Sequence, residues 1–277
     1  MEKPETNIPV MRHFDDIDDL LNFGRDSDLI PGQEESATPV AKEIYSKVLR
    51  ENKSAVMFVC SGRKRAVQTA GLVADKLEEM DNNLKIRIVA EERLEAIDQG
   101  KFILPVGYKP GEPFPGLSLA NKVFSKEVFG LEKGNYLYKF GDPVLLDDGS
   151  YKYPELLPYF ESYGENNRDF LLRIYELVVE TYHKLDKLSS KTEVVVVTHA
   201  QLYQILRDLS TVAEMVKKQN LTFATGKLPE LCWKLYSERF KNEKPSYNTN
   251  YISIENLGDP DIIQLLNREI EYLKDLK

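Results

Sequence analysis

The stretch EVVVVTH, residues 193–199, decides the expected fold of this chain. Its run of valines is short, apolar and β-branched, and therefore predicts a buried strand. The strand ends at Thr198 and His199 and leads directly into QLYQILRDL, which predicts a helix over residues 201–209. In α/β folds, the loops at the carboxyl ends of the strands carry the chemistry. His199 is therefore a candidate functional residue.

A second histidine occupies the same kind of position near the N-terminus. Residues 8–13, IPVMRH, predict a short strand that ends at Arg12 and His13, and the chain has only three histidines. An isolated histidine at a strand end commonly serves as a hydrogen-bonding residue. The adjacent Arg12 supports another interpretation, because guanidinium donors suit phosphate oxygens. A neutral His13 could attack phosphorus while Arg12 stabilises the developing charge.

Strands and helices alternate around these two stretches. The pattern predicts helices over 37–50, 65–77 and 168–185 and a closing helix after Asp259, with strands over 55–60, 85–89 and 251–257. This order favours an α/β fold, a three-layer α/β/α sandwich with a mainly parallel central sheet.

Residues 100–163 differ from the rest of the chain. They hold many of its prolines, glycines and aromatic residues, and their periodicity is weak. The segment is too long for a simple connector in a compact fold. Its aromatic content argues against disorder. We expect one domain over residues 1–277, with residues 100–163 inserted as a cap or lid.

The composition restricts the function classes. A formal net charge of −8 argues against a nucleic-acid partner, although a local basic pocket can lie in an acidic surface. Cys60 and Cys232 are the only cysteines, which favours a reducing compartment. No stretch resembles a signal peptide or is long enough to span a bilayer. We expect a cytoplasmic protein without a membrane partner; the oligomeric state is left open.

A basic cluster follows the strand over 55–60. In CSGRKRAVQTA, residues 60–70, Arg63, Lys64 and Arg65 lie where that strand meets a helix N-terminus, which favours an anion. For Arg63 and Lys64 a solvated basic turn is an equal alternative, whereas Arg65 heads the helix. The same stretch resembles the phosphate loop of low-molecular-weight tyrosine phosphatases. Those need arginine six residues after the cysteine, and Ala66 stands there, so Cys60 is expected to pack as a buried side chain.

Taken in order, these motifs resemble the histidine phosphatase superfamily, which has the phosphoglycerate mutase-like fold. The resemblance covers nearly the whole chain apart from residues 100–163. Its matching blocks are Arg12-His13-Phe14, Ser61 followed by Arg65-Ala66-Val67-Gln68-Thr69-Ala70, Leu94-Glu95 through Gly100, Gly164-Glu165-Asn166 with Arg173, Thr198-His199-Ala200, and a closing strand from Asn248.

The resemblance implies a mechanism. His13 would accept the phosphoryl group of a small phosphorylated organic molecule, and Arg12, Arg65 and His199 would complete the phosphate pocket. A carboxylic acid from the third block would protonate the leaving oxygen, and water would then release phosphate. The family uses no metal, and the resemblance implies no cofactor.

The chain departs from the family pattern at three positions. The family's acid falls on Ala96, which cannot donate a proton, and Glu95 and Asp98 flank it as possible acids. On an extended segment Asp98 would share the side of Ala96, and Glu95 would point to the opposite side. Phe14 and Ala200 each replace a glycine. Phe14 would either add bulk beside the pocket or turn away from it.

These departures leave three hypotheses. The first is a phosphomonoester hydrolase that acts through phospho-His13, with Glu165, Asp15 and Asp16 as further candidate acids. The second is a catalytically degenerate phosphatase-like protein that binds a phosphorylated ligand or partner. The third is a repurposed phosphoryl-transfer enzyme.

Overall fold

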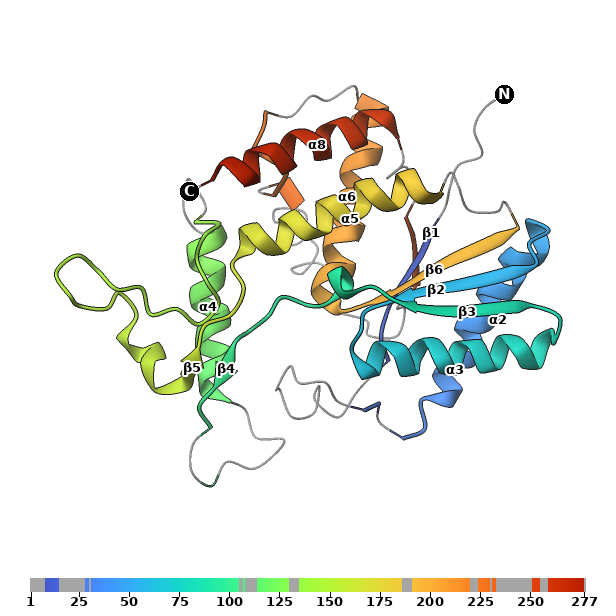
Figure 1. The fold of residues 1–277 in the computed structure, drawn as a ribbon, viewed down its shortest axis with the longest axis horizontal. Coiled ribbons are helices and arrows are strands. Elements are labelled where there is room, and N and C mark those ends of the chain that lie inside the picture. Colours follow the sequence, from blue (N-terminus) through green and yellow to red (C-terminus); the bar gives the residue numbers. More distant parts are fainter. Residues whose placement is uncertain are drawn as a thin grey trace.

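A computed structural model describes most of the chain (Figure 1). The described residues are 8–14, 28–29, 31–104, 107, 114–129, 135–185, 191–219, 224–229, 231–232, 251–254 and 259–276. Strands and helices alternate along them, with the bounds β1 (Ile8–Arg12), α2 (Glu34–Arg50), β2 (Ala55–Cys60), α3 (Lys64–Met80), β3 (Lys85–Ala90), the 3₁₀ helix η1 (Glu92–Leu94), β4 (Lys101–Phe102), α4 (Pro115–Phe129), the 3₁₀ helix η2 (Pro154–Tyr159), β5 (Phe160–Ser162), α5 (Asn167–Leu185), β6 (Thr192–Thr198), α6 (Ala200–Gln219), β7 (Tyr251–Ile254) and α8 (Pro260–Asp275).

The central sheet has the strand order β3-β2-β6-β1-β7. β6 runs parallel to both of its neighbours, β1 and β2, and β3 runs parallel to β2. Among the described strands of this sheet, only β7, at one edge, runs antiparallel to its neighbour, β1. The predicted α/β fold with a mainly parallel sheet is confirmed. Because β6 lies between β1 and β2, the carboxyl ends of these three strands meet at one place.

Helices cover both faces of the sheet, which explains the uninterrupted valine run in β6. Val195 and Val197 pack in the core formed with α2 and α3, whereas Val196 packs on the other face with α5, α6 and α8. All three side chains are buried. A strand that is buried on both faces needs apolar residues at consecutive positions.

Several elements differ from their expected bounds: α2 begins at Glu34 instead of residue 37, and α3 ends at Met80 instead of residue 77. Helix α6 continues to Gln219 instead of ending at residue 209. Val212 and Ala213 are buried and extend the apolar stripe beyond Leu209. The polar residues between Leu209 and Val212 therefore belong to the outer face of one longer helix. Of the strand predicted over 251–257, residues 251–254 form β7, and residues 255–257 lie outside the described residues.

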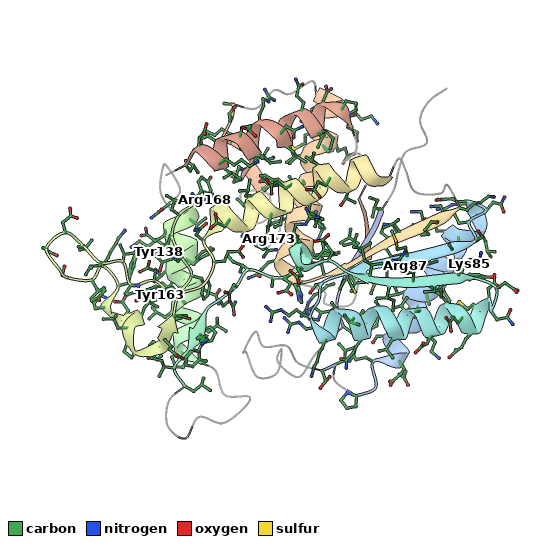
Figure 2. The ribbon with its side chains drawn as sticks, in the orientation of Figure 1. Lys85, Arg87, Tyr138, Tyr163, Arg168 and Arg173 are labelled. Atoms are coloured by element: carbon green, nitrogen blue, oxygen red, sulfur yellow. The ribbon has the colours of Figure 1, made fainter. Side chains whose placement is uncertain are left out.

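The segment predicted as a cap contains helix α4, which its weak periodicity did not indicate. β4 pairs antiparallel with β5, and the aromatic side chains gather in a core of their own. The buried members of that core are Ala120, Val123, Tyr138, Phe140, Tyr153, Leu156 and Phe160. Figure 2 shows Tyr138 and Tyr163 in this segment, well apart from Lys85 and Arg87 on the edge strand β3. The role of the segment as a cap stays a prediction.

Candidate active site

Three strand ends bring the two predicted histidines together. The backbone N–H of His13, directly after β1, donates to the carbonyl of Thr198 at the end of β6 over 2.9 Å. On the other side of β6, the N–H of Ser61 donates to the carbonyl of Val197 over 3.0 Å. As a result, the imidazole rings of His13 and His199 lie 5.0 Å apart between centroids. Both side chains are buried.

The His13 ring is held in one tautomer. Its Nδ1 lies 2.7 Å from the carbonyl oxygen of Phe14, and a carbonyl oxygen only accepts hydrogen bonds, so Nδ1 carries the proton. In the neutral ring the lone pair is then on Nε2. Burial, together with the positive charges of Arg12 and Arg65, lowers the pKa of His13 to about 3. At neutral pH the imidazole is therefore uncharged and suited to act as a nucleophile.

His199 is engaged through both ring nitrogens. Nε of Arg65 donates to its Nδ1 over 3.3 Å, and its Nε2 lies 2.7 Å from the hydroxyl oxygen of Ser61. Burial, His13 and three arginines, Arg65, Arg63 and Arg12, keep the pKa of His199 well below its usual value. Two neutral imidazoles thus lie among guanidinium groups, an arrangement whose positive charge favours a bound anion.

Thr69 ties the first strand loop to helix α3. Its hydroxyl accepts from the backbone N–H of Phe14 over 2.9 Å and donates to the carbonyl of Arg65 over 2.8 Å. The Phe14 ring is buried in the core between the sheet and helices α2 and α3. Of the two outcomes expected for Phe14, the ring therefore turns away from the histidines.

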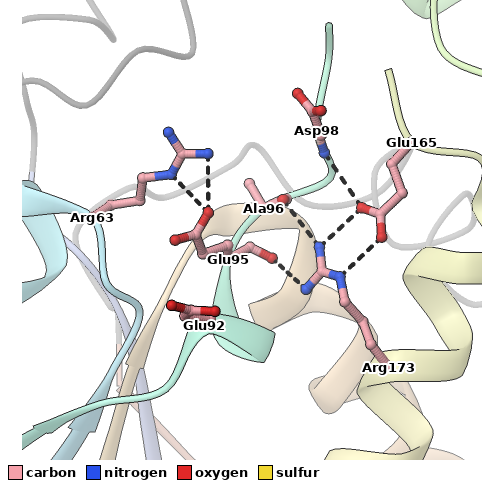
Figure 3. Close-up of a pocket in the computed structure, with 7 residues that line it drawn as sticks. All are labelled: Arg63, Glu92, Glu95, Ala96, Asp98, Glu165 and Arg173. Carbon is pink, nitrogen blue, oxygen red and sulfur yellow. Dashed lines mark hydrogen bonds and ion pairs between the residues drawn. The ribbon is translucent and has the colours of Figure 1, made fainter. Parts of the chain in front are cut away.

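The segment after η1 carries the candidate acids (Figure 3). Oε2 of Glu95 accepts from Nε and Nη2 of Arg63, both over 3.0 Å. The other oxygen, Oε1, lies 3.4 Å from the place where a Cβ on Gly62 would stand, so Glu95 adjoins the turn that follows β2. Arg63, for which a solvated turn was an equal alternative, thus holds a candidate acid.

Asp98 has a different role in the structure. Its Oδ1 accepts from the backbone N–H of Gly100 over 3.0 Å, and the residue is exposed. Gly100 has a φ of +77°, and a Cβ there would lie 2.3 Å from the carbonyl oxygen of Ser162, so only glycine fits. Asp98 therefore stabilises a tight turn and is not brought into contact with the histidines. Asp15 and Asp16 lie outside the described residues.

Arg173 of α5 fixes the path of this segment, as Figure 3 shows. Nη1 donates to the carbonyls of Arg93 and Glu95 over 2.7 and 2.9 Å, and Nη2 donates to the carbonyl of Ala96 over 3.1 Å. Nε and Nη2 also donate to the two carboxylate oxygens of Glu165, at 3.0 and 3.1 Å. A guanidinium has five N–H donors, and this one uses all of them.

A pocket opens between these side chains. It has a volume of about 380 Å³ and is lined by Arg63, Glu92, Glu95, Ala96, Asp98, Glu165 and Arg173. The pocket and the paired histidines are joined through Arg63, whose side chain binds Glu95 and whose backbone N–H donates to the Ser61 hydroxyl over 3.2 Å.

Cys60 lies in the core, in a position that does not suit a nucleophile. Its side chain is buried on the α2 and α3 face of the sheet, and burial raises the pKa of its thiol. A raised thiol pKa opposes thiolate formation. The expectation that Cys60 packs as a small apolar residue is in line with this position.

Sequence reasoning assigned no role to Ser61 beyond its place in a motif. A usable sign was its position, because it directly follows β2 just as His13 follows β1 and His199 follows β6. Within the described ranges, no group of three or more His, Cys, Asp and Glu side chains is placed to hold a metal ion. No helix in the same ranges is both long and apolar enough to cross a bilayer.

Comparisons with known proteins assign this chain to no family. No model of a protein family matches this chain, and no curated protein sequence matches it significantly. Among solved structures, the chain is similar to a mycobacterial glucosyl-3-phosphoglycerate phosphatase, with 14% identity and a TM-score of 0.41, over 81% of this chain and 83% of that one. The same phosphatase in complex with VO3 gives 15% identity and a TM-score of 0.41, over 81% and 84%. A likeness at this level assigns neither a family nor an activity.

Proposed function

We propose that this chain is a histidine phosphatase, a phosphomonoester hydrolase that acts through a phosphohistidine at His13. The observation that supports this most directly is the 2.7 Å hydrogen bond between Nδ1 of His13 and the carbonyl of Phe14. It places the lone pair on Nε2 of a neutral ring. That is the form of histidine that can attack phosphorus.

The charges around His13 suit a phosphoryl group. Arg12 and Arg65 lie close enough to lower the pKa of both imidazoles, and Arg63 adds to the effect on His199. A phosphoryl dianion would be attracted by this positive field, and guanidinium groups can stabilise the charge that spreads over its oxygens. We propose a small phosphorylated organic molecule as the substrate, with no cofactor required.

The reaction would proceed in two steps. Nε2 of His13 attacks phosphorus, the N–P bond forms, and the bond to the substrate oxygen breaks, with a proton passing to that oxygen. Water then attacks the phosphohistidine, the N–P bond breaks, and inorganic phosphate leaves as His13 returns to its starting form. Arg12 and Arg65 would stabilise the phosphoryl oxygens in both steps.

Of the candidate acids that the structure describes, Glu95 is the best placed proton donor. The Asp98 carboxylate accepts the backbone N–H of Gly100 in a turn, and both carboxylate oxygens of Glu165 accept hydrogen bonds from Arg173. Glu95 adjoins the turn after β2, but its carboxylate is paired with Arg63. Donation therefore requires Glu95 to take up a proton and release Arg63. In the second step it can receive a proton from the attacking water.

The test is hydrolysis of p-nitrophenyl phosphate and of a panel of sugar and nucleotide phosphates. His13→Ala is expected to abolish release of phosphate, because no other group replaces the nucleophile. His183→Ala is the matched control, since it removes the third histidine, which belongs to none of the motifs above, and it should keep full activity. Turnover that survives in His13→Ala would overturn the phosphohistidine mechanism.

A second candidate function is phosphate binding without turnover. Ala96 at the usual acid position and the ion pair between Glu95 and Arg63 favour it. In that case inorganic phosphate would bind and no phosphomonoester would be hydrolysed. Calorimetric titration with phosphate, run beside the hydrolysis assay, separates the two functions.

A further inference from the structure

The hydrogen bonds of His199 define the state of its ring. An arginine side chain only donates, so Nδ1 of His199 accepts from Nε of Arg65 and carries no proton. Because the ring is neutral, the proton is on Nε2. The 2.7 Å contact is therefore a hydrogen bond that Nε2–H of His199 donates to the Ser61 hydroxyl oxygen.

The donor and acceptor roles of the Ser61 hydroxyl can be assigned in the same way. A hydroxyl group offers two acceptor sites and one donor. Its oxygen accepts from Nε2–H of His199 over 2.7 Å and from the backbone N–H of Arg63 over 3.2 Å, so both acceptor sites are used. Only the hydroxyl proton remains, and the described residues provide no acceptor for it. Ser61 is fully buried, and buried donors normally have a partner.

We propose that Ser61 is a phosphate-binding residue of this site: its hydroxyl donates to the bound phosphoryl group, and His199 acts on that group through Ser61. The inference rests on the proposed function, since it assumes an anion at His13. It differs from the expectation that His199 contacts phosphate itself. Direct donation by Nε2–H would break its bond to Ser61, and Nδ1 has no proton to donate.

The position of Ser61 fits this role. It follows β2, next to the end of β6, so its hydroxyl belongs to the same set of strand ends as the two imidazoles. Arg63 N–H and His199 Nε2–H both polarise the hydroxyl, and a hydroxyl that accepts two hydrogen bonds becomes a stronger donor. A hydrogen bond to a charged acceptor is also stronger than one between neutral groups.

Inorganic phosphate is the probe for the test, with binding measured by calorimetry. Ser61→Ala is expected to weaken phosphate binding roughly tenfold or more, the usual effect of losing a hydrogen bond to a charged group. Ser61→Thr, which keeps the hydroxyl, should restore much of the affinity. Ser46→Ala is the control, because its exposed hydroxyl only donates to the carbonyl of Lys42 within α2. It should bind phosphate as the wild type does.

A second measurement needs no variant at position 61. In ¹⁵N-histidine spectra of the wild type, the His199 ring should show a protonated Nε2 and a bare Nδ1, before and after phosphate is added. A His199 ring protonated on Nδ1, or one that changes tautomer when phosphate binds, would overturn the proposal.

The outcomes separate this proposal from the proposed function. If the wild type binds phosphate and Ser61→Ala binds it equally well, the role of Ser61 is refuted and the phosphatase proposal stands. If the wild type neither binds phosphate nor hydrolyses any phosphomonoester, both are refuted.

Discussion

The rings of His13 and His199 lie 5.0 Å apart between centroids with their planes inclined by 59°, and burial lowers the pKa of both. Neither ring is charged at neutral pH. Two buried neutral imidazoles beside several arginines form a site that is positive but still holds an unprotonated nucleophile. This combination is the physical basis of the proposed phosphoryl chemistry.

The lowered pKa of His13 predicts a loss of stability in acid. Its pKa is about 3 in the folded protein against 6.5 for the free side chain, so the unfolded chain binds more protons below pH 6.5. The titration of His13 leaves the free energy of unfolding unchanged well above pH 6.5 and lowers it as the pH falls from 6.5 toward 3. Between pH 6 and 4 the wild type should lose about 2–3 kcal/mol more unfolding free energy than His13→Gln. Urea unfolding at the two pH values measures this, and equal losses in the two proteins would contradict it.

Thr69→Val should destabilise the protein. The substitution leaves the buried N–H of Phe14 without its acceptor, which typically costs about 1–3 kcal/mol. Thr211→Val is the matched control. Its hydroxyl donates to the carbonyl four residues earlier, as that of Thr69 does, but accepts no second bond from the described residues, so we expect a change below about 0.5 kcal/mol. Equal effects of the two substitutions in urea unfolding would refute the role given to Thr69.

Arg173→Ala should loosen the segment that carries Glu95. The variant removes donors from three backbone carbonyls and removes the ion pair of Glu165, which predicts a destabilisation of about 3 kcal/mol. Arg173→Lys keeps the charge, but an ammonium group cannot reproduce the planar set of hydrogen bonds that the guanidinium makes. It should therefore recover less than half of the lost unfolding free energy. Unfolding free energies of the three proteins provide the check, and full recovery in Arg173→Lys would show that charge alone matters.

Glu95→Gln should separate substrates by their leaving group. If Glu95 delivers the proton, kcat for alkyl phosphates should fall about 10²–10⁴-fold, while kcat for p-nitrophenyl phosphate should change far less. Asp98→Asn is the control, since its side chain stabilises the turn at Gly100. A larger effect of Asp98→Asn on alkyl phosphates would move the proton donor to Asp98.

The sequence predicted the strands, and the positions of His13 and His199 at strand ends, because these patterns are local. A run of β-branched residues that ends in histidine is visible without knowing what lies beside it, as at residues 193–199. Helix α4 and the last turns of α6 were missed. In both, polar residues on the outer face obscured an apolar stripe that only packing reveals, such as Val212 and Ala213.

The partners within the site could not be predicted, since they depend on contacts between distant segments. That Ser61 bonds to His199, 138 residues away, follows from β6 lying between β1 and β2. The pairing of Arg63 with Glu95 likewise depends on how the chain leaves β3. The direction of the Phe14 ring was open for the same reason, because the apolar space between α2 and α3 that accepts it is built from other elements.

The most direct test of the central claim is to look for the covalent intermediate. The wild-type protein is mixed with p-nitrophenyl phosphate, quenched rapidly at alkaline pH, where phosphohistidine survives, and digested for peptide mass spectrometry. The account predicts one phosphoryl group on His13 and none in His13→Ala. Turnover with no label on His13, or with the label on another residue, would contradict it.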